Sequence, residues 1–172
     1  PALIFMEPYR VKRLMAFLNP WASPLDEGFQ LIQSLYGLGA GGLFGVGLFN
    51  SRQKYSFLPF AESDFIFSII GEELGFVGAM FIILVFVILV MSLITIARRA
   101  KTRYAMLLVA GVASVIAVQT ILNIAVVTGS IPPTGLPLPF ISAGSTSLIV
   151  FMSAIGICLN VAKQSKLKEI KM

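Results

Sequence analysis

The sequence predicts an all-α fold: a polytopic helical membrane protein with three full transmembrane helices and a large extracytoplasmic loop containing short helices. Three observations predict this class. Hydrophobic residues make up 57% of the chain and charged residues 12%, and that charged share is about half of what soluble domains carry. Long uncharged stretches lie between Glu73 and Arg98 and between Arg103 and Lys163. Basic residues gather at the ends of these stretches, as they do beside membrane spans.

The uncharged stretches hold the predicted spans, because a helix crosses the hydrocarbon core with about 20 residues. The first stretch has 24 residues and holds one span, at 75–97. The second has 59 residues and holds two, at 105–127 and 140–162. Between these two, TGSIPPTGLPLP (128–139) contains four prolines and two glycines, which exclude a continuous helix. This segment is predicted to be a hinge.

Charge predicts the side of the membrane that each loop occupies. The loop at 98–104 and the tail at 163–172 together carry eight basic residues and one acidic residue. The positive-inside rule places both in the cytoplasm. Residues 7–74 and the hinge are then extracytoplasmic, and 1–6 is interpreted as the end of a truncated transmembrane helix. We expect the chain to be the C-terminal part of a longer protein.

Composition argues against several functions. A net charge of +5 would suit a nucleic-acid binder, but the basic residues lie beside apolar spans, where they act as topology signals. No nucleic-acid partner is therefore predicted. One cysteine and no histidine exclude an internal disulfide and a Cys/His metal site. Cys158, inside an apolar run, is predicted to be an inert residue facing lipid or another helix.

The predicted outer loop contains a short helix and then a glycine-rich stretch. Apolar residues in FQLIQSLYGL (29–38) follow helical spacing, which predicts a helix lying on the bilayer or on other spans. The next stretch, GLGAGGLFGVG, has six glycines in eleven residues. No strand precedes its GxGxxG pattern, so a dinucleotide site is rejected. We interpret the glycines as backbone that bends or packs closely, and a phosphate cradle of N–H groups is the alternative.

Four carboxylates stand in LPFAESDFIFSIIGEELG (58–75), directly before the first span. They are Glu62, Asp64, Glu72 and Glu73. Ser63 or Asp64 can cap a helix that runs through 65–70 into the span. Asp64, Ser68 and Glu72 then share one helix face. Spacing leaves two interpretations open: a cap with two interfacial acids, or a carboxylate facing a cavity as general base or ion ligand.

These motifs resemble those of a known family. The carboxylate stretch, GFQLIQSLYGLGAGGLFGVGL, NSRQK and NIAVVTGSIPPTGLPLPFISAGSTSL are similar to segments of the SEDS proteins (FtsW, SpoVE and RodA). The resemblance covers roughly residues 8–162, and FLNPW and NSRQK favour FtsW and SpoVE over RodA. It implies a ten-span fold, of which this chain is the C-terminal part.

The resemblance implies an inverting peptidoglycan glycosyltransferase of the bacterial cytoplasmic membrane. Such an enzyme polymerises lipid II into glycan strands on the outer face and releases undecaprenyl diphosphate, for division, at the septum, or for sporulation. The implied partners are lipid II, a monofunctional penicillin-binding transpeptidase, other division proteins and membrane lipids. Without the preceding spans, this chain alone is expected to be inactive.

The resemblance also assigns roles to residues. The aspartate of the family's TDFIF motif matches Asp64, the candidate catalytic base. Glu72 and Glu73 match GEELG and are supporting residues or, with Asp64, ligands of a divalent cation such as Mg²⁺ or Mn²⁺. Binding of the substrate diphosphate is assigned to basic residues of the outer loop: Arg52, Lys54, Arg10 and Arg13. Their simpler role is to anchor the chain at the interface.

Two departures and two alternative functions bear on this assignment. The family's LPEAHTD is LPFAESD here, so Glu62 replaces a histidine, and Ala143 replaces a tyrosine in PFISAGSTSL.

A lipid II flippase would use Gln119 and Asn123, one turn apart, to line a pathway, whereas their simpler role is hydrogen bonding between helices. A non-catalytic scaffold of the wall-synthesis machinery would tolerate loss of Asp64, and an enzyme would not.

Overall fold

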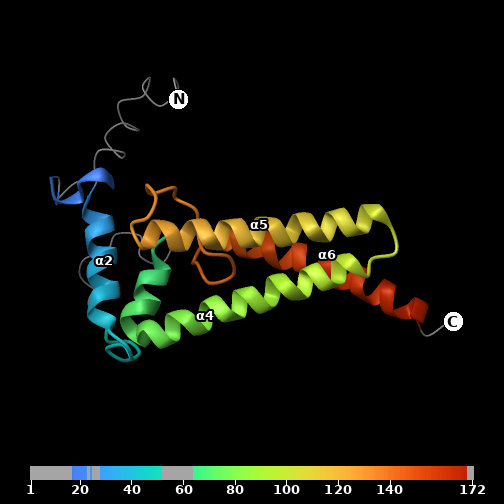
Figure 1. Cartoon of the computed structure of the whole chain (residues 1–172), viewed down its shortest axis with the longest axis horizontal. Coiled ribbons are helices and arrows are strands. Elements are labelled where there is room, and N and C mark those ends of the chain that lie inside the picture. The colour runs from blue at the N-terminus through green and yellow to red at the C-terminus, as the bar shows by residue number, and fades with distance from the viewer. Residues whose placement is uncertain (1–16, 23, 25–27, 52–63, 170–172) are drawn as a thin grey trace, which may run out of the picture.

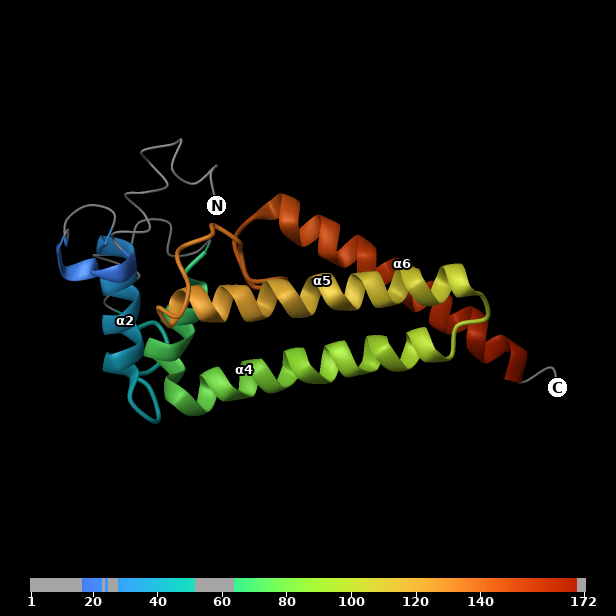
Figure 2. The same ribbon diagram turned by 45° about the horizontal axis from the view of Figure 1, so that its top comes forward.

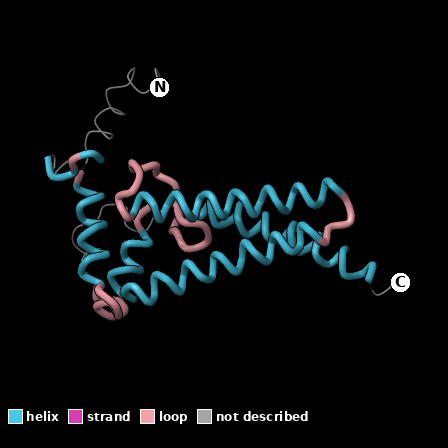
Figure 3. Tube along the Cα trace, in the orientation of Figure 1, coloured by secondary structure: helices cyan, strands magenta, loops and turns pink. Residues whose placement is uncertain are grey.

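The computed structural model describes residues 17–22, 24, 28–51 and 64–169 (Figure 1). Within these ranges every regular element is a helix and none is a strand (Figure 3), so the predicted all-α class is confirmed. The elements in chain order are the 3-10 helix η2 (Pro20–Ala22) and the α-helices α2 (Phe29–Gly41), α4 (Ile66–Arg98), α5 (Arg103–Val127) and α6 (Ser145–Glu169). The predictions for 1–6 and for Arg10, Arg13, Arg52 and Lys54 lie outside the described residues.

Helices α4, α5 and α6 are each long and apolar enough to cross a membrane. Helices α4 and α5 run side by side in opposite directions, and α6 crosses α5 obliquely (Figures 1 and 2). The short α4–α5 connection and the C-terminal end of α6 lie at the same end of the molecule. The two basic segments therefore share one end, which is the arrangement that the charge-based orientation requires.

Local chemistry sets both ends of α5. The side chain of its N-cap, Thr102, accepts a hydrogen bond at 3.2 Å from the backbone N–H three residues on. At the other end Gly129 has a φ of 68°. The N–H groups of Gly129 and Ser130 donate to the carbonyls of Val126 and Ala125 at 3.0 and 2.8 Å. This pairing is a Schellman motif, so the predicted hinge begins where glycine ends the helix.

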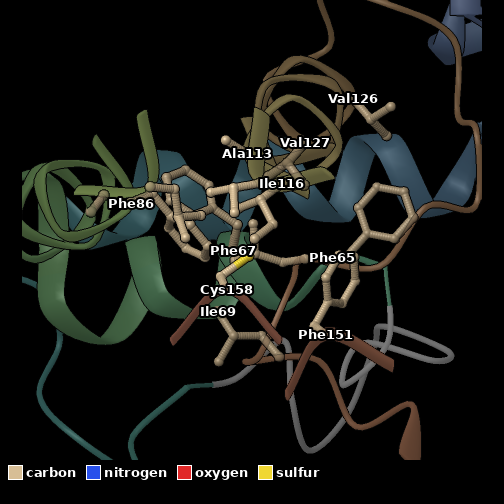
Figure 4. Packing of buried hydrophobic residues seen from close by; sticks show 14 of the residues in the cluster. Phe65, Phe67, Ile69, Phe86, Ala113, Ile116, Val126, Val127, Phe151 and Cys158 are labelled. Atoms are coloured by element: carbon tan, nitrogen blue, oxygen red, sulfur yellow. The ribbon is translucent and has the colours of Figure 1, made fainter. Parts of the chain in front are cut away.

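The core follows one seam between α4 and α5. Buried residues of α4 recur every seven positions, at Ala79, Phe86 and Leu93. Those of α5 recur at alternating spacings of four and three: Val109, Ala113, Ile116, Thr120 and Asn123. Such spacings place one stripe of each helix against the other. Figure 4 shows Cys158 of α6 in this cluster beside Phe67, so the cysteine faces other helices.

Two predicted helices differ from the structure. The helix expected from residue 140 begins instead at Ser145, because Phe140 has a φ of 65° and so cannot continue a right-handed helix. The helix expected to run unbroken into the first span is interrupted at Gly75. The N-cap of α4 is Phe65, which makes no side-chain capping hydrogen bond. The predicted cap Ser63 lies outside the described residues.

Candidate functional site

The glycine-rich loop after α2 holds the break in α4 at Gly75. A broken helix leaves carbonyls before the break and N–H groups after it without helical partners. The N–H groups of residues 46–47 donate to the carbonyls of 72–73 at 2.9 and 3.1 Å. In return, the N–H groups of 76–77 donate to the carbonyls of 42–43 at 2.9 and 3.2 Å. The loop therefore supplies the hydrogen bonds that α4 loses, and we call this arrangement the Gly75 joint.

Glycine is required where the backbones of the joint touch. A Cβ on Gly75 would lie 2.6 Å from the carbonyl oxygen of Leu43. A Cβ on Gly45 would overlap the carbonyl of Glu73. The prediction that these glycines bend and pack closely is therefore confirmed. The alternative phosphate cradle is wrong for 45–47, because their three N–H groups already donate to carbonyls of the chain.

Helix α2 connects the joint to the end of α5. It lies across the ends of the long helices (Figure 1) and continues three residues beyond the predicted 29–38, to Gly41. The buried hydroxyl of Ser34 donates to the carbonyl of Val127 at 3.0 Å, where the last turn of α5 has no helical donor. Leu38 packs against Gly71, at which a Cβ would lie 2.5 Å from Leu38 Cδ2. Small residues thus let α2 approach the first half of α4.

Asp64 lies two residues before α4 and faces the hinge between α5 and α6. Its side chain is half-buried. Its Oδ2 lies 3.6 Å from the position that a Cβ on Gly135 would take. The buried side chain of Asn123 on α5 donates from Nδ2 to the carbonyl oxygens of Asp64 and Leu136, both at 2.8 Å. Three segments distant in sequence therefore meet at Asp64.

The two amides of α5 bind the hinge backbone. Gln119, one turn before Asn123, donates from Nε2 to the carbonyl oxygen of Pro137 at 2.9 Å. The interpretation of both residues as hydrogen-bonding between helices is therefore wrong in its acceptors: both amides bond within the chain, but to loop carbonyls. Sequence reasoning missed the link to Asp64. The sequence did contain a signal for this link. Two amide side chains lie at i and i+4, just before a Pro-rich hinge whose carbonyls need hydrogen-bond donors.

Glu72 belongs to the Gly75 joint, and its side chain is 2% exposed. One carboxylate oxygen accepts a hydrogen bond at 2.5 Å from the hydroxyl of Ser51, at the far end of the glycine-rich loop. Of the three residues predicted to share one helix face, Ser68 and Glu72 are buried on α4. Asp64 precedes the helix and so is not on that face. Because a buried carboxylate needs hydrogen bonds, we expect Glu72 to have a structural role. Glu73 is half-buried.

The sequence and fold both match known proteins. The chain matches the FTSW_RODA_SPOVE family, described as "Cell cycle protein", over residues 2–167. It belongs to the FtsW/RodA/SpoVE family. Stage V sporulation protein E of Bacillus subtilis (strain 168) is 50% identical over 164 residues, which are 95% of this chain and 45% of that protein. A probable peptidoglycan glycosyltransferase FtsW of Trichlorobacter lovleyi is 47% identical over 168 residues, or 98% and 44% of the two chains.

A similar solved structure is described as "Structural coordination of polymerization and crosslinking by a peptidoglycan synthase complex", and it has the same fold. Its TM-score is 0.76 at 28% identity, and the match covers 96% of this chain and 45% of that one. The chain thus spans slightly less than half the length of the family members it matches.

We expect Glu72→Leu to destabilise this family member by about 1–3 kcal/mol, because it removes a buried acceptor of the Ser51 hydroxyl. Thermal unfolding of the full-length protein in detergent measures the change. Glu73→Leu is the matched control, since this neighbour is half-buried and is expected to unfold close to the parent temperature. Equal unfolding temperatures for Glu72→Leu and the parent would refute the structural role.

Proposed function

We propose that the full-length protein polymerises lipid II on the outer face of the bacterial cytoplasmic membrane, during division or sporulation. The observation that carries this proposal is the position of Asp64: a half-buried carboxylate beside the hinge, at the end of the long helices opposite the basic loop. Family membership and relatives named probable peptidoglycan glycosyltransferases support it. The activity is proposed for the whole protein, and we expect this part alone to be inactive.

The proposed reaction needs a base and positive charge. An acceptor sugar hydroxyl attacks the anomeric carbon that bears the lipid diphosphate. The bond from that carbon to the diphosphate breaks, the configuration inverts, and undecaprenyl diphosphate leaves. Asp64 accepts the hydroxyl proton, and cationic side chains stabilise the leaving diphosphate. The basic residues proposed for the second role remain Arg52, Lys54, Arg10 and Arg13.

The location of the polar groups favours chemistry at the membrane surface over transport. A flippase needs polar groups that line a path at mid-membrane depth. The Gln119 and Asn123 amides instead donate to loop carbonyls. The hydroxyls of Ser92, Thr95 and Thr120 each donate to a carbonyl one turn earlier in their own helix. The hydrogen bonds of these described side chains are internal to the chain, which supports surface chemistry over transport.

The proposal is tested with the full-length protein purified in detergent together with its proposed partner, a monofunctional penicillin-binding transpeptidase with an inactivated active site. Labelled lipid II is added, and glycan strands are separated by length. We expect strands and released undecaprenyl diphosphate. Detergent micelles offer no second compartment, so a flippase forms no product, and a scaffold forms none without an added polymerase. Either result would refute the proposal.

We also propose that a divalent cation such as Mg²⁺ or Mn²⁺ takes part. When bound, it would neutralise charge on the diphosphate. In the part of the chain that the structure describes, no three Asp, Glu, His or Cys side chains form a metal-binding group. Joint ligation by Asp64, Glu72 and Glu73 is therefore not supported, whereas Mg²⁺ commonly uses one or two carboxylates plus phosphate oxygens.

Chelation tests the cation proposal. We expect EDTA to lower polymerisation by about tenfold or more, because catalytic cations supply several kcal/mol of charge stabilisation. Excess Mg²⁺ or Mn²⁺ should restore the rate. Two separate controls test for effects of the chelator itself. One uses EDTA presaturated with Ca²⁺, and the other uses EDTA presaturated with Zn²⁺. An unchanged rate in EDTA, after dialysis against it, would remove the cation from the reaction.

A further inference from the structure

We infer that Asn123 is a positioning residue that orients Asp64, an inference that rests on the proposed function. A carboxamide nitrogen has two N–H donors, and in Asn123 both are used. One bonds the carbonyl oxygen of Asp64 and the other that of Leu136, each at 2.8 Å. A single side chain on α5 thereby connects the backbone that carries the proposed base to the backbone of the hinge.

The bond reaches Asp64 at a point where helix geometry does not hold it. Helix α4 begins at Ile66, so the Asp64 peptide lies outside the regular helix. The orientation of that peptide determines where the carboxylate points. On the hinge side, Leu136 directly follows Gly135, where an added Cβ would lie 3.6 Å from Asp64 Oδ2. Asn123 therefore fixes both the backbone behind the carboxylate and the backbone in front of it.

The environment of the Asn123 side-chain oxygen indicates that stability alone does not explain why an amide is present at this position. The side chain is 1% exposed. Its Oδ1 is buried and has no hydrogen-bond partner among the described residues. A buried carbonyl without a partner is destabilising. Asn123 is destabilised at its oxygen, yet both of its N–H groups bond two different loops. Such an amide is suited to holding the two loops in a fixed relative position.

Gln119 provides the matched comparison. It lies one turn earlier on α5 and donates one hydrogen bond to Pro137, in the same hinge. Its hydrogen bond goes to the hinge and not to Asp64, and its side chain is only half-buried. Removing the Gln119 amide should loosen the hinge without releasing the Asp64 backbone. Asn123→Leu and Gln119→Leu therefore separate an effect on Asp64 from an effect on the hinge alone.

The test measures lipid II polymerisation by both variants in the full-length protein with its transpeptidase. For Asn123→Leu we expect kcat per folded molecule to fall by about tenfold to a hundredfold, the loss that a misplaced catalytic group causes. We expect little change in KM, and the acidic limb of the pH–rate profile should move, because the Asp64 carboxylate enters a new environment. Gln119→Leu should keep the parent pH profile and most of the parent kcat.

Each outcome decides the inference. An unchanged kcat and pH profile in Asn123→Leu overturns it, and so do equal losses in both variants, which would assign the effect to the hinge as a whole. If Asn123→Leu does not fold, the smaller and uncharged Asn123→Ala, which removes the same two donors, is measured in its place. The proposed function fails separately, if Asp64→Asn polymerises lipid II as fast as the parent.

Discussion

Asp64→Asn is expected to abolish lipid II polymerisation, lowering kcat of the full-length protein by about 10²–10⁴-fold, the usual contribution of a general base. The amide has the size of the carboxylate but cannot accept the hydroxyl proton at neutral pH. The fold should survive, because Asn123 binds the main-chain carbonyl of residue 64, which the substitution leaves in place. Strand formation from labelled lipid II measures the loss.

The control for this experiment is Glu73→Gln, a half-buried carboxylate near the same end of the long helices. It removes one negative charge without touching Asp64 and is expected to retain most of the activity. Both variants must bind the transpeptidase and unfold at the parent temperature. If Asp64→Asn forms strands at the parent rate, the carboxylate is not the base, and the transport or scaffold function becomes the better explanation.

Gly75→Ala is expected to destabilise the full-length protein by about 3–5 kcal/mol, near the upper end for a single substitution. Gly75 has φ 69° and ψ −169°, a backbone region that is essentially restricted to glycine and costs other residues about 1–3 kcal/mol. The added methyl group would also lie 2.6 Å from the carbonyl oxygen of Leu43. Relieving that contact would break the hydrogen bonds that the glycine-rich loop makes with α4.

Thermal unfolding in detergent and yield in the membrane fraction measure this effect. Gly39→Ala is the matched control, because Gly39 lies within α2 and an added Cβ meets no atom within 4 Å. Alanine is favoured over glycine in a helix by about 1 kcal/mol, so this variant should be as stable as the parent or slightly more stable. Equal stability of Gly75→Ala and Gly39→Ala would show that the joint does not require glycine.

The sequence by itself determined the three long apolar helices, the hinge that follows α5 and the end of the molecule at which basic residues gather. These features depend on neighbouring residues. The length of an uncharged stretch predicts a span, and clustered prolines exclude a helix. The glycines of residues 37–47 likewise predicted close packing. The resemblance of SDFIF to a family motif selected Asp64 among four acids that composition could not distinguish.

Only the tertiary structure decided the break in α4, the buried hydrogen bond between Ser51 and Glu72, and the link from Asn123 to Asp64. IIGEELGF has the composition of a continuous helix, and Gly75 permits either a helix or a sharp turn. The glycine-rich loop favours the turn because it supplies partners for the freed backbone groups. The Asn123–Asp64 bond joins residues 59 positions apart. Every residue type carries a main-chain carbonyl. A side-chain amide that bonds such a carbonyl at this separation therefore leaves no recognisable pattern in the sequence.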